Sequence, residues 1–481
     1  MKVSVAVLSK QNENVVETVL DVLKSFDVTK PLRFGLVSPK RILFDKNLAL
    51  LSKQSTETAT LAGYATTTET RTASHYNFLQ LDDTSLFFEG KVYSPIPEKE
   101  ISEQISKAPQ HCEATLQTLI EQADGDYSFL LLKKGMIASG RDPIGVQPLY
   151  YGENRDLAAF ASNRKAFWRL GIENPASFPP GNLAFMNRDG FKFKPIKALK
   201  LTEPKLVTLD DAAVKLQALL EESIHRRTQG LKKVAVAFSG GLDSSLVAYL
   251  ARRFGVEVQL LHVSMENEAE TEVAIDAAEA LELPLQVDLF KDSDVEKTLP
   301  KVVALIEEAD PVKAAIGVPF YWVAEKASEA GFKIMLAGQG ADELFGGYQR
   351  YVSEYCQNSD EKVRRTMFND VVRIHENNLE RDLKITSFHD VELRLPFATY
   401  DLAEYALSLP LDCKIEPQVD TLRKLVLRKL AKNIGVPTSI TEKPKKAVQY
   451  STGISDALKR IARKHGMPVN EYIVELFRNS R

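Results

Sequence analysis

The chain alternates between short apolar runs and stretches in which apolar residues recur at helical spacing. Val234–Phe238 is an apolar run without polar interruption, as expected for a buried parallel strand. Apolar residues between 246 and 251 then recur at the spacing of a helix. Residues 239–245, SGGLDSS, are therefore predicted to form a turn from a strand into a helix.

The same pattern returns about a hundred residues later, in MLAGQGADELFGGY at residues 335–348. An apolar strand leads into a turn bracketed by Gly338 and Gly340, and two acids and a helix follow. Repeated units of strand, turn and helix predict an α/β fold with a parallel sheet in this half of the chain.

The length of the chain indicates two domains, because 481 residues exceed what a single core normally organises. The pattern changes from FKFKPIK to a strongly helical stretch over residues 212–227. We therefore expect a first domain over 1–195, a linker over 196–212 and a second domain over 213–481.

Composition excludes several classes of protein. The net charge is −3 with 44% apolar residues, which is typical of a soluble globular chain. No run of 18 apolar residues indicates a membrane span, and the first residues lack a signal-peptide cleavage pattern. Three widely spaced cysteines do not form a disulfide framework, so a reducing cytoplasm is expected.

The first turn has the chemistry of a phosphate site. Gly240 and Gly241 allow the backbone to approach a ligand closely, and the new helix directs unpaired N–H groups at it. Further donors come from the hydroxyls of Ser239, Ser244 and Ser245. The turn is not a Walker A motif, because no lysine follows the glycines.

Acidic residues in both turns indicate a metal ion. A carboxylate such as Asp243 would repel a phosphate unless a cation lay between them, which argues for Mg²⁺ on a polyphosphate. Asp342 and Glu343, in the second turn, are candidates for the same ion.

These two motifs resemble those of the asparagine synthetase family, S-G-G-x-D-S-S followed by G-x-G-A/S-D-E-x-F-G-G-Y. The resemblance continues through VELRLP at 391–396 and ALSLP at 406–410, and it ends at Lys443–Lys445, which is similar to the family's R/K-P-K. β-Lactam synthetases are also similar. Because members of this family are expected to form homodimers, the resemblance implies a homodimer here.

The resemblance also implies a reaction in two steps. A carboxylate attacks the α-phosphorus of ATP and releases pyrophosphate, and ammonia or an amine then attacks the acyl-adenylate. Carried over by motif, Asp243 and Asp342 would hold Mg²⁺, the first loop would cradle the pyrophosphate and Lys445 would stabilise charge at the reacting centre. Adenosine would lie near Leu261, His262 and Val263.

The first part of the chain resembles the glutaminase domain of this family, a stacked-sheet fold of the N-terminal-nucleophile type. DGDYSF at 124–129, RDPIGVQPLYY at 141–151 and FAS at 160–162 carry the resemblance. That hydrolase needs a cysteine exposed at its N-terminus, and Lys2 stands there. Glu89 replaces the asparagine that stabilises the oxyanion. We expect no glutaminase activity.

Two departures lie within the synthetase half. Gln339 stands where asparagine synthetases carry a glutamate, and an amide cannot accept a proton from an incoming amine. Ala315 stands where they carry an arginine. Aspartate is the default substrate, but these changes make a different acid plausible.

Two other functions remain open. Residues 421–470 hold twelve Lys or Arg and two acids, so a tRNA-modifying enzyme that adenylates a base could use them to grip phosphates. The plainer interpretation is a solvated basic face on a helix with Arg423, Lys424, Arg428 and Lys429, and likewise a solvated loop at Lys445. A catalytically inert scaffold is the third reading.

Overall fold

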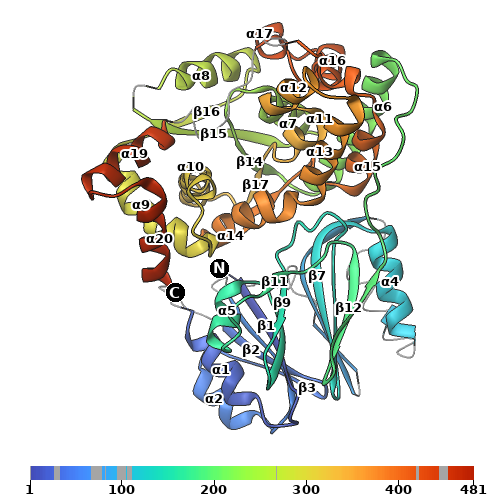
Figure 1. Ribbon diagram of the computed structural model, residues 1–481, viewed down its shortest axis with the longest axis vertical. Helices are drawn as coiled ribbons and strands as arrows, with labels where there is room; N and C mark the ends of the chain where they lie inside the picture. Colours follow the sequence, from blue (N-terminus) through green and yellow to red (C-terminus); the bar gives the residue numbers. More distant parts are fainter. Residues whose placement is uncertain are drawn as a thin grey trace. The chain divides into compact units, whose positions relative to one another are not determined.

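The computed structural model describes residues 2–26, 33–66, 78–81, 83–94, 104–105, 111–266, 268–418, 422–443 and 453–481. The chain divides into two compact units, residues 1–198 with Arg481 and residues 199–480 (Figure 1). Each unit has its own sheets and core.

The first unit contains two antiparallel sheets stacked face to face (Figure 1). The first sheet has the order β11-β9-β10-β1-β4-β2-β3 and the second the order β13-β12-β8-β7-β6-β5. The first sheet consists of β1 (Lys2–Ser9), β2 (Arg33–Ser38), β3 (Arg41–Asp45), β4 (Thr60–Thr66), β9 (Tyr150–Glu153), β10 (Leu157–Ala161) and β11 (Ala176–Ser177). The second consists of β5 (Phe78–Leu81), β6 (Thr84–Ser94), β7 (Asp124–Lys133), β8 (Met136–Arg141), β12 (Asn182–Asn187) and β13 (Gly190–Pro195).

Side chains from the two sheets interdigitate between them. Tyr64 of β4 packs against Phe87 of β6 with ring centroids 5.8 Å apart. The outer face of the first sheet is covered by α1 (Val16–Lys24), α2 (Leu48–Gln54) and α5 (Arg164–Arg169), and that of the second by α4 (Cys112–Gln122). The expected stacked-sheet fold of the first domain is confirmed.

The second unit is built on a parallel sheet with the order β16-β15-β14-β17-β18. Its strands are β14 (Lys233–Ala237), β15 (Glu257–Met265), β16 (Leu285–Phe290), β17 (Ile334–Leu336) and β18 (Glu392–Arg394). Successive strands extend from β14 to β16 on one side, and β17 and β18 continue on the other. The order reverses between β14 and β17, and ligands of open α/β sheets bind at such a switch point.

Helices surround this sheet (Figure 1). They are α6 (Leu209–Thr228), α7 (Leu242–Arg253), α8 (Glu270–Ala280), α9 (Asp292–Ile306), α10 (Pro311–Glu329), α11 (Ala341–Phe345), α12 (Gln349–Tyr355), α13 (Asp360–Val372), α14 (Glu380–Phe388), α15 (Tyr400–Ser408), α16 (Leu425–Asn433), α17 (Thr438–Thr441), α19 (Ile454–Lys464) and α20 (Val469–Ser480). A π-helical turn, η3 (His375–Leu379), leads into α14, and a 3₁₀ turn, η4 (Leu411–Cys413), follows α15. The expected α/β class with a parallel sheet is confirmed. Across the described residues, no helix has the length and apolarity needed to cross a membrane.

Candidate active site

A cavity of about 340 Å³ opens at the switch point of the parallel sheet. The loop after β14 and the loop after β17 form two of its walls, and β15 forms a third. The start of α16 and residues of α10 complete it. Both glycine-rich loops that the sequence predicted line this cavity, whereas the segments 391–396 and 406–410 do not.

The first loop keeps its donors in a compact arrangement. The backbone N–H of Ser239 donates to Ser244 Oγ at 3.3 Å, and Gly241 N–H donates to Ser239 Oγ at 3.4 Å. Gly240 has φ +70°, and a Cβ there would lie 2.8 Å from the backbone of Ala274. Gly241 caps α7 without a side-chain hydrogen bond, so the amides of the first turn face the cavity mouth. This is the geometry that binds phosphate oxygens.

The two motifs lie against each other. A Cβ on Gly338 would approach Cβ of Asp243 to 2.8 Å, so only glycine allows the loops this contact. Asp243 lies in the first turn of α7 and Asp342 in the first turn of α11. Acids that are a hundred residues apart in the sequence therefore face the same end of the cavity.

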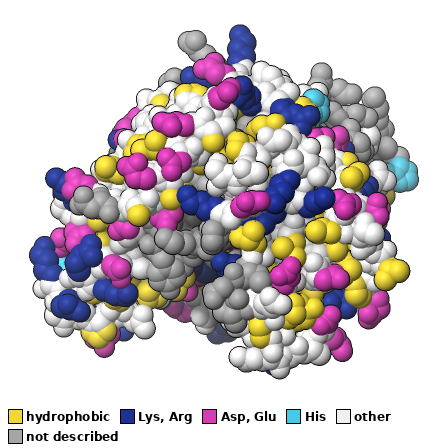
Figure 2. Space-filling model, turned by 90° about the horizontal axis from the view of Figure 1, so that it is seen from above, with side chains coloured by type: hydrophobic (Ala, Val, Ile, Leu, Met, Phe, Trp, Pro, Cys, Tyr) yellow, Lys and Arg dark blue, Asp and Glu magenta, His cyan; other side chains and the backbone are white. Residues whose placement is uncertain are grey.

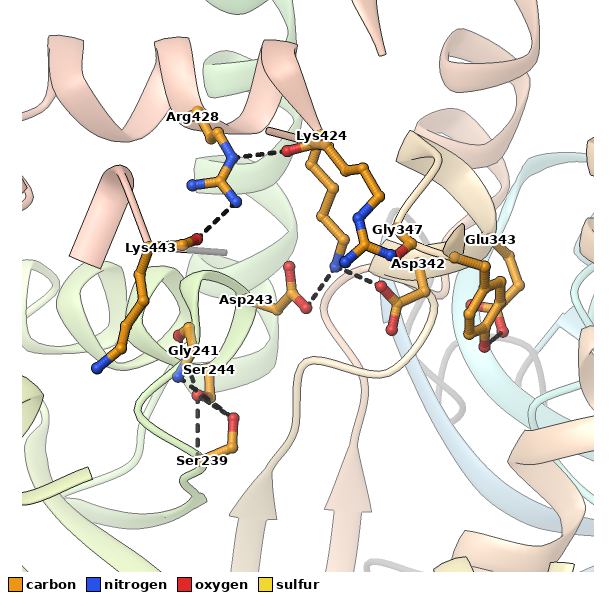
Figure 3. Close-up of polar contacts among 12 residues, drawn as sticks. Ser239, Gly241, Asp243, Ser244, Asp342, Glu343, Gly347, Lys424, Arg428 and Lys443 are labelled. Carbon is orange, nitrogen blue, oxygen red and sulfur yellow. Dashed lines mark hydrogen bonds and ion pairs between the residues drawn. The ribbon is translucent and has the colours of Figure 1, made fainter. Parts of the chain in front are cut away.

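Lys424 bridges these two acids (Figure 3). Its Nζ lies 2.6 Å from Asp243 Oδ2 and 2.6 Å from Asp342 Oδ1. The Lys424 side chain is 2% exposed, whereas the two carboxylates are 17% and 20% exposed. The solvated basic face expected at this position is thus wrong for Lys424, and also for the buried Arg428.

The donor set bears on which metal could bind. The described residues contain no group of three or more His, Cys, Asp or Glu that could hold a metal ion. Two carboxylates beside a phosphate loop nevertheless suit Mg²⁺, which commonly takes one or two carboxylates and completes its shell with phosphate oxygens and water. Asp243 and Asp342 fit that pattern and not a closed protein cage.

Two arginines extend the positive wall beside Lys424. Arg423 donates from Nη1 to the carbonyl of Gly347 at 2.9 Å. Arg428 donates to the carbonyl of Arg423 at 2.6 Å and to that of Lys443 at 2.8 Å, so it ties the start of α16 to the segment after α17. Burial lowers the pKa of the Arg428 guanidinium, while the charge of Asp243 opposes the shift. Lys443 also lines the cavity, but in Figure 3 its amine extends away from the two acids.

His262 forms part of the wall contributed by β15, together with Leu261 and Val263. Its Nδ1 lies 3.0 Å from the carbonyl of Phe238, which can only accept, so Nδ1 carries the hydrogen. Burial lowers the pKa of His262, and this hydrogen bond opposes the shift. The ring is therefore neutral at pH 7.

Gln339 follows β17 and lines the cavity, and its amide is held by a hydrogen bond to a buried carboxylate. Nε2 donates to Oδ2 of Asp382, a residue of α14 that is fully buried. This bond uses one of the two N–H groups on Nε2, so Gln339 can present its carbonyl oxygen as an acceptor and its second N–H as a donor.

Not every predicted residue reaches the cavity. Ser245 is fully buried and points into the packing of α7, and neither it nor Gly340 lines the cavity. Glu343 accepts from Tyr348 Oη at 2.5 Å and from Asn378 Nδ2 at 2.6 Å, so it braces the turn, and it does not line the cavity as Asp342 does. Lys445 lies outside the described residues.

The sequence contains a signal for the burial of Lys424. Lys424 and Arg428 are spaced i, i+4 and share a helical stripe with Leu427 and Ala431, which are buried. Lysine and arginine are rarely fully buried unless they are paired with an acid, so basic residues on an apolar stripe indicate acidic partners. Sequence alone does not show which acids pair with Lys424, because Asp243 and Asp342 come from distant loops.

Comparisons with known proteins identify the family that this chain resembles. The family model described as asparagine synthase matches residues 215–360 and 353–468, and that of a glutamine amidotransferase domain matches 97–169. "Putative asparagine synthetase (glutamine-hydrolyzing) 1" of Methanocaldococcus jannaschii is 34% identical over 404 residues, 74% of each chain. Asparagine synthetase (glutamine-hydrolyzing) of Asparagus officinalis is 27% identical over 73% of this chain and 61% of its own length.

These relatives identify the protein as a carbon–nitrogen ligase of an ATP-dependent family. The chain belongs to the asparagine synthase family. Among solved structures, the allosteric regulatory enzyme of purine biosynthesis aligns with 11% identity over 60% of this chain and 80% of its own, at a TM-score of 0.33. A score this low carries no argument.

Proposed function

We propose that the protein is an AMP-forming amide synthetase that adenylates a carboxylate with ATP and couples it to free ammonia or an amine. The observation that carries this proposal is the meeting of the phosphate loop with Asp243, Asp342 and Lys424 at one end of one cavity. Such a meeting of donors, acids and cations suits a polyphosphate with its metal ion.

The residues that line the cavity would each contribute to the adenylation step. The amides and hydroxyls of Ser239, Gly241 and Ser244 would hold the departing pyrophosphate, and the adenosine would lie along β15. Mg²⁺, held by Asp243 and Asp342, would neutralise charge on the phosphates. Cations fixed beside the leaving group are worth a few kcal/mol of barrier, comparable to one preorganised donor. Lys445 remains our candidate for charge stabilisation at the acyl centre.

Gln339 shapes the second step. Its carbonyl oxygen can accept a hydrogen bond from the amine, but it cannot take the proton. The nucleophile must therefore arrive as the free base. Aspartate is the default acid, and the neutral Gln339 together with Ala315 also fits a different carboxylate.

We further propose that glutamine is not hydrolysed, although relatives carry that activity in their names. Lys2 stands where a nucleophilic cysteine would be needed. Glu89 is buried, and its carboxylate accepts a hydrogen bond from Ser4 Oγ at 2.8 Å. A carboxylate in the place of an oxyanion donor would repel the charge that it should stabilise. The domain would serve packing or assembly.

The rival functions have less support. Basic residues of α19 are engaged with acids of α9, since Arg460 pairs with Asp292 at 2.6 Å and Lys464 with Glu296 at 2.9 Å. Lys, Arg, Asp and Glu are interspersed on the face shown in Figure 2, unlike a phosphate-binding stripe. A scaffold would have no need to retain the paired acids and the phosphate loop. We place the protein in a reducing compartment, where the free thiols of its three cysteines would persist.

Product analysis tests the proposal. The enzyme is incubated with Mg-ATP, aspartate and ammonium chloride, and adenine nucleotides are separated; AMP in equal amount to the amide is expected. Substituting other carboxylic acids and amines identifies the substrate if aspartate gives no AMP. Formation of ADP would contradict an adenylating mechanism.

A further inference from the structure

Lys424 provides one positive charge to two carboxylates that converge on the same atom. The distances from Nζ are equal, 2.6 Å to Asp243 Oδ2 and 2.6 Å to Asp342 Oδ1. The ammonium thus lies between the acids, at the point from which a divalent cation could contact both. The three residues come from three separate segments: Asp243 from α7, Asp342 from α11, and Lys424 from the position that caps α16.

Lys424 has a backbone conformation that is unfavourable for a lysine. Its φ of +61° and ψ of +46° belong to the left-handed region, which non-glycine residues rarely adopt. A residue in that conformation persists only where its surroundings over-determine it, and such residues cluster at functional sites. Lys424 is also a cation at a helix N-terminus, which the helix dipole disfavours.

Gly347 allows the close packing around the bridge. A Cβ on Gly347 would lie 1.7 Å from Asp342 Oδ1 and 2.4 Å from Lys424 Cε. Its amide donates to the backbone carbonyl of Asp342 at 2.8 Å, and Arg423 holds its carbonyl. The glycine therefore closes one side of the bridge, and the lysine cannot leave in that direction.

From this geometry we propose that Lys424 is a built-in counter-ion that takes the place of the divalent cation while no nucleotide is bound. An ammonium within 3 Å of both acids repels Mg²⁺ and lowers the affinity of the pair for the free metal. The phosphates of ATP then offer Lys424 another anionic partner, so the metal enters together with the nucleotide. This last step rests on the proposed function, whereas the counter-ion role does not.

Metal binding without nucleotide tests the counter-ion role. We compare the parent protein with Lys424→Met, which keeps most of the length of the side chain and removes its charge. The matched control is Lys429→Met on the same helix, since Lys429 pairs with Asp210 and is 35% exposed. Affinity for Mn²⁺, as a stand-in for Mg²⁺, is measured by electron paramagnetic resonance, and thermal midpoints are recorded in EDTA and in Mg²⁺.

The expected result is a tightening of Mn²⁺ binding by roughly tenfold or more in Lys424→Met alone, because the two carboxylates lose the ammonium that lies between them. Its thermal midpoint falls in EDTA and recovers in Mg²⁺, whereas the parent and Lys429→Met do not respond to the metal. Equal or weaker Mn²⁺ binding by Lys424→Met would overturn the proposal.

A second variant covers the case in which Lys424→Met does not fold. In Asp243→Asn with Lys424→Met, one acid is neutralised together with the lysine. A folded double variant shows that charge imbalance was the fault, as proposed; a double variant that also fails to fold shows that the lysine is needed for packing, which contradicts the proposal. None of these measurements depends on adenylation, so a failure of the proposed function would be seen separately.

Discussion

The amide of Gln339 donates from Nε2 to Oδ2 of Asp382 at 2.7 Å. Asp382 also accepts from its neighbour Arg381 at 2.7 and 3.0 Å, and all of Asp382 is buried. Burial raises the pKa of Asp382, and Arg381 opposes that shift. One buried carboxylate and one guanidinium are thus balanced, and a neutral residue at position 339 keeps them so.

This balance predicts the outcome of Gln339→Glu. A glutamate would place a second carboxylate within hydrogen-bonding distance of Asp382, where two carboxylates cannot both ionise without cost. We expect a loss of about 1–3 kcal/mol in the free energy of unfolding, and asparagine formation from aspartate that falls or stays at zero. Urea unfolding and an AMP assay measure both.

The matched control adds Asp382→Asn to Gln339→Glu. The double variant restores the original number of charges and should regain most of the lost stability. If Gln339→Glu instead raises asparagine formation by 10- to 100-fold, as one added acid–base group can, then the protein is an ordinary asparagine synthetase that lacks its base.

Asp243→Asn should weaken binding of Mg-ATP by roughly 100-fold, because the proposed metal ligand would be lost and Lys424 would keep only one acid. Isothermal calorimetry measures this. Asp276→Asn, which alters an exposed acid of α8, serves as the control. Equal affinities in Asp243→Asn and the parent would remove the metal role from Asp243.

His262 should make stability depend on pH. Its folded pKa is lowered from 6.5 by burial, so it contributes stability that is present above about pH 6.5 and is lost as the pH falls below that value. His262→Gln should lose less stability than the parent between pH 6.5 and 5.5, by at most about 1.4 kcal/mol. Parallel urea curves for the two proteins over this range would show that the ring is not held neutral.

Glutamine should not be a nitrogen source. With ATP, the acid and glutamine present, we expect no glutamate above background, because Lys2 and Glu89 replace the nucleophile and the oxyanion donor. Ammonium chloride should support turnover in the same preparation. Lys2→Cys alone should not restore hydrolysis, since Glu89 still opposes the oxyanion. Release of glutamate by the parent would contradict this account.

The sequence was sufficient for the classes of both folds and for the two loops. Uninterrupted apolar runs such as Val234–Phe238 identify buried strands, and the glycines after them identify turns that approach a ligand. Local pattern carries this information because strand, turn and helix are contiguous in the chain.

The position of Lys424 in the cavity could not be predicted from local sequence pattern. Lys424 follows Asp243 by about 180 residues, and its burial depends on acids that only the folded sheet brings to it. The support of Gln339 by Asp382 is likewise a contact between distant segments. Sequence identified the two loops that line the cavity, but not the basic residues that pair with the acids of these loops.

Exchange of labelled pyrophosphate into ATP, in the presence of a panel of carboxylic acids and with no amine, tests the central claim most directly. The account predicts exchange that requires one particular acid and Mg²⁺ and that disappears in Asp243→Asn. Turnover of ATP to ADP with no pyrophosphate exchange for any acid would contradict it.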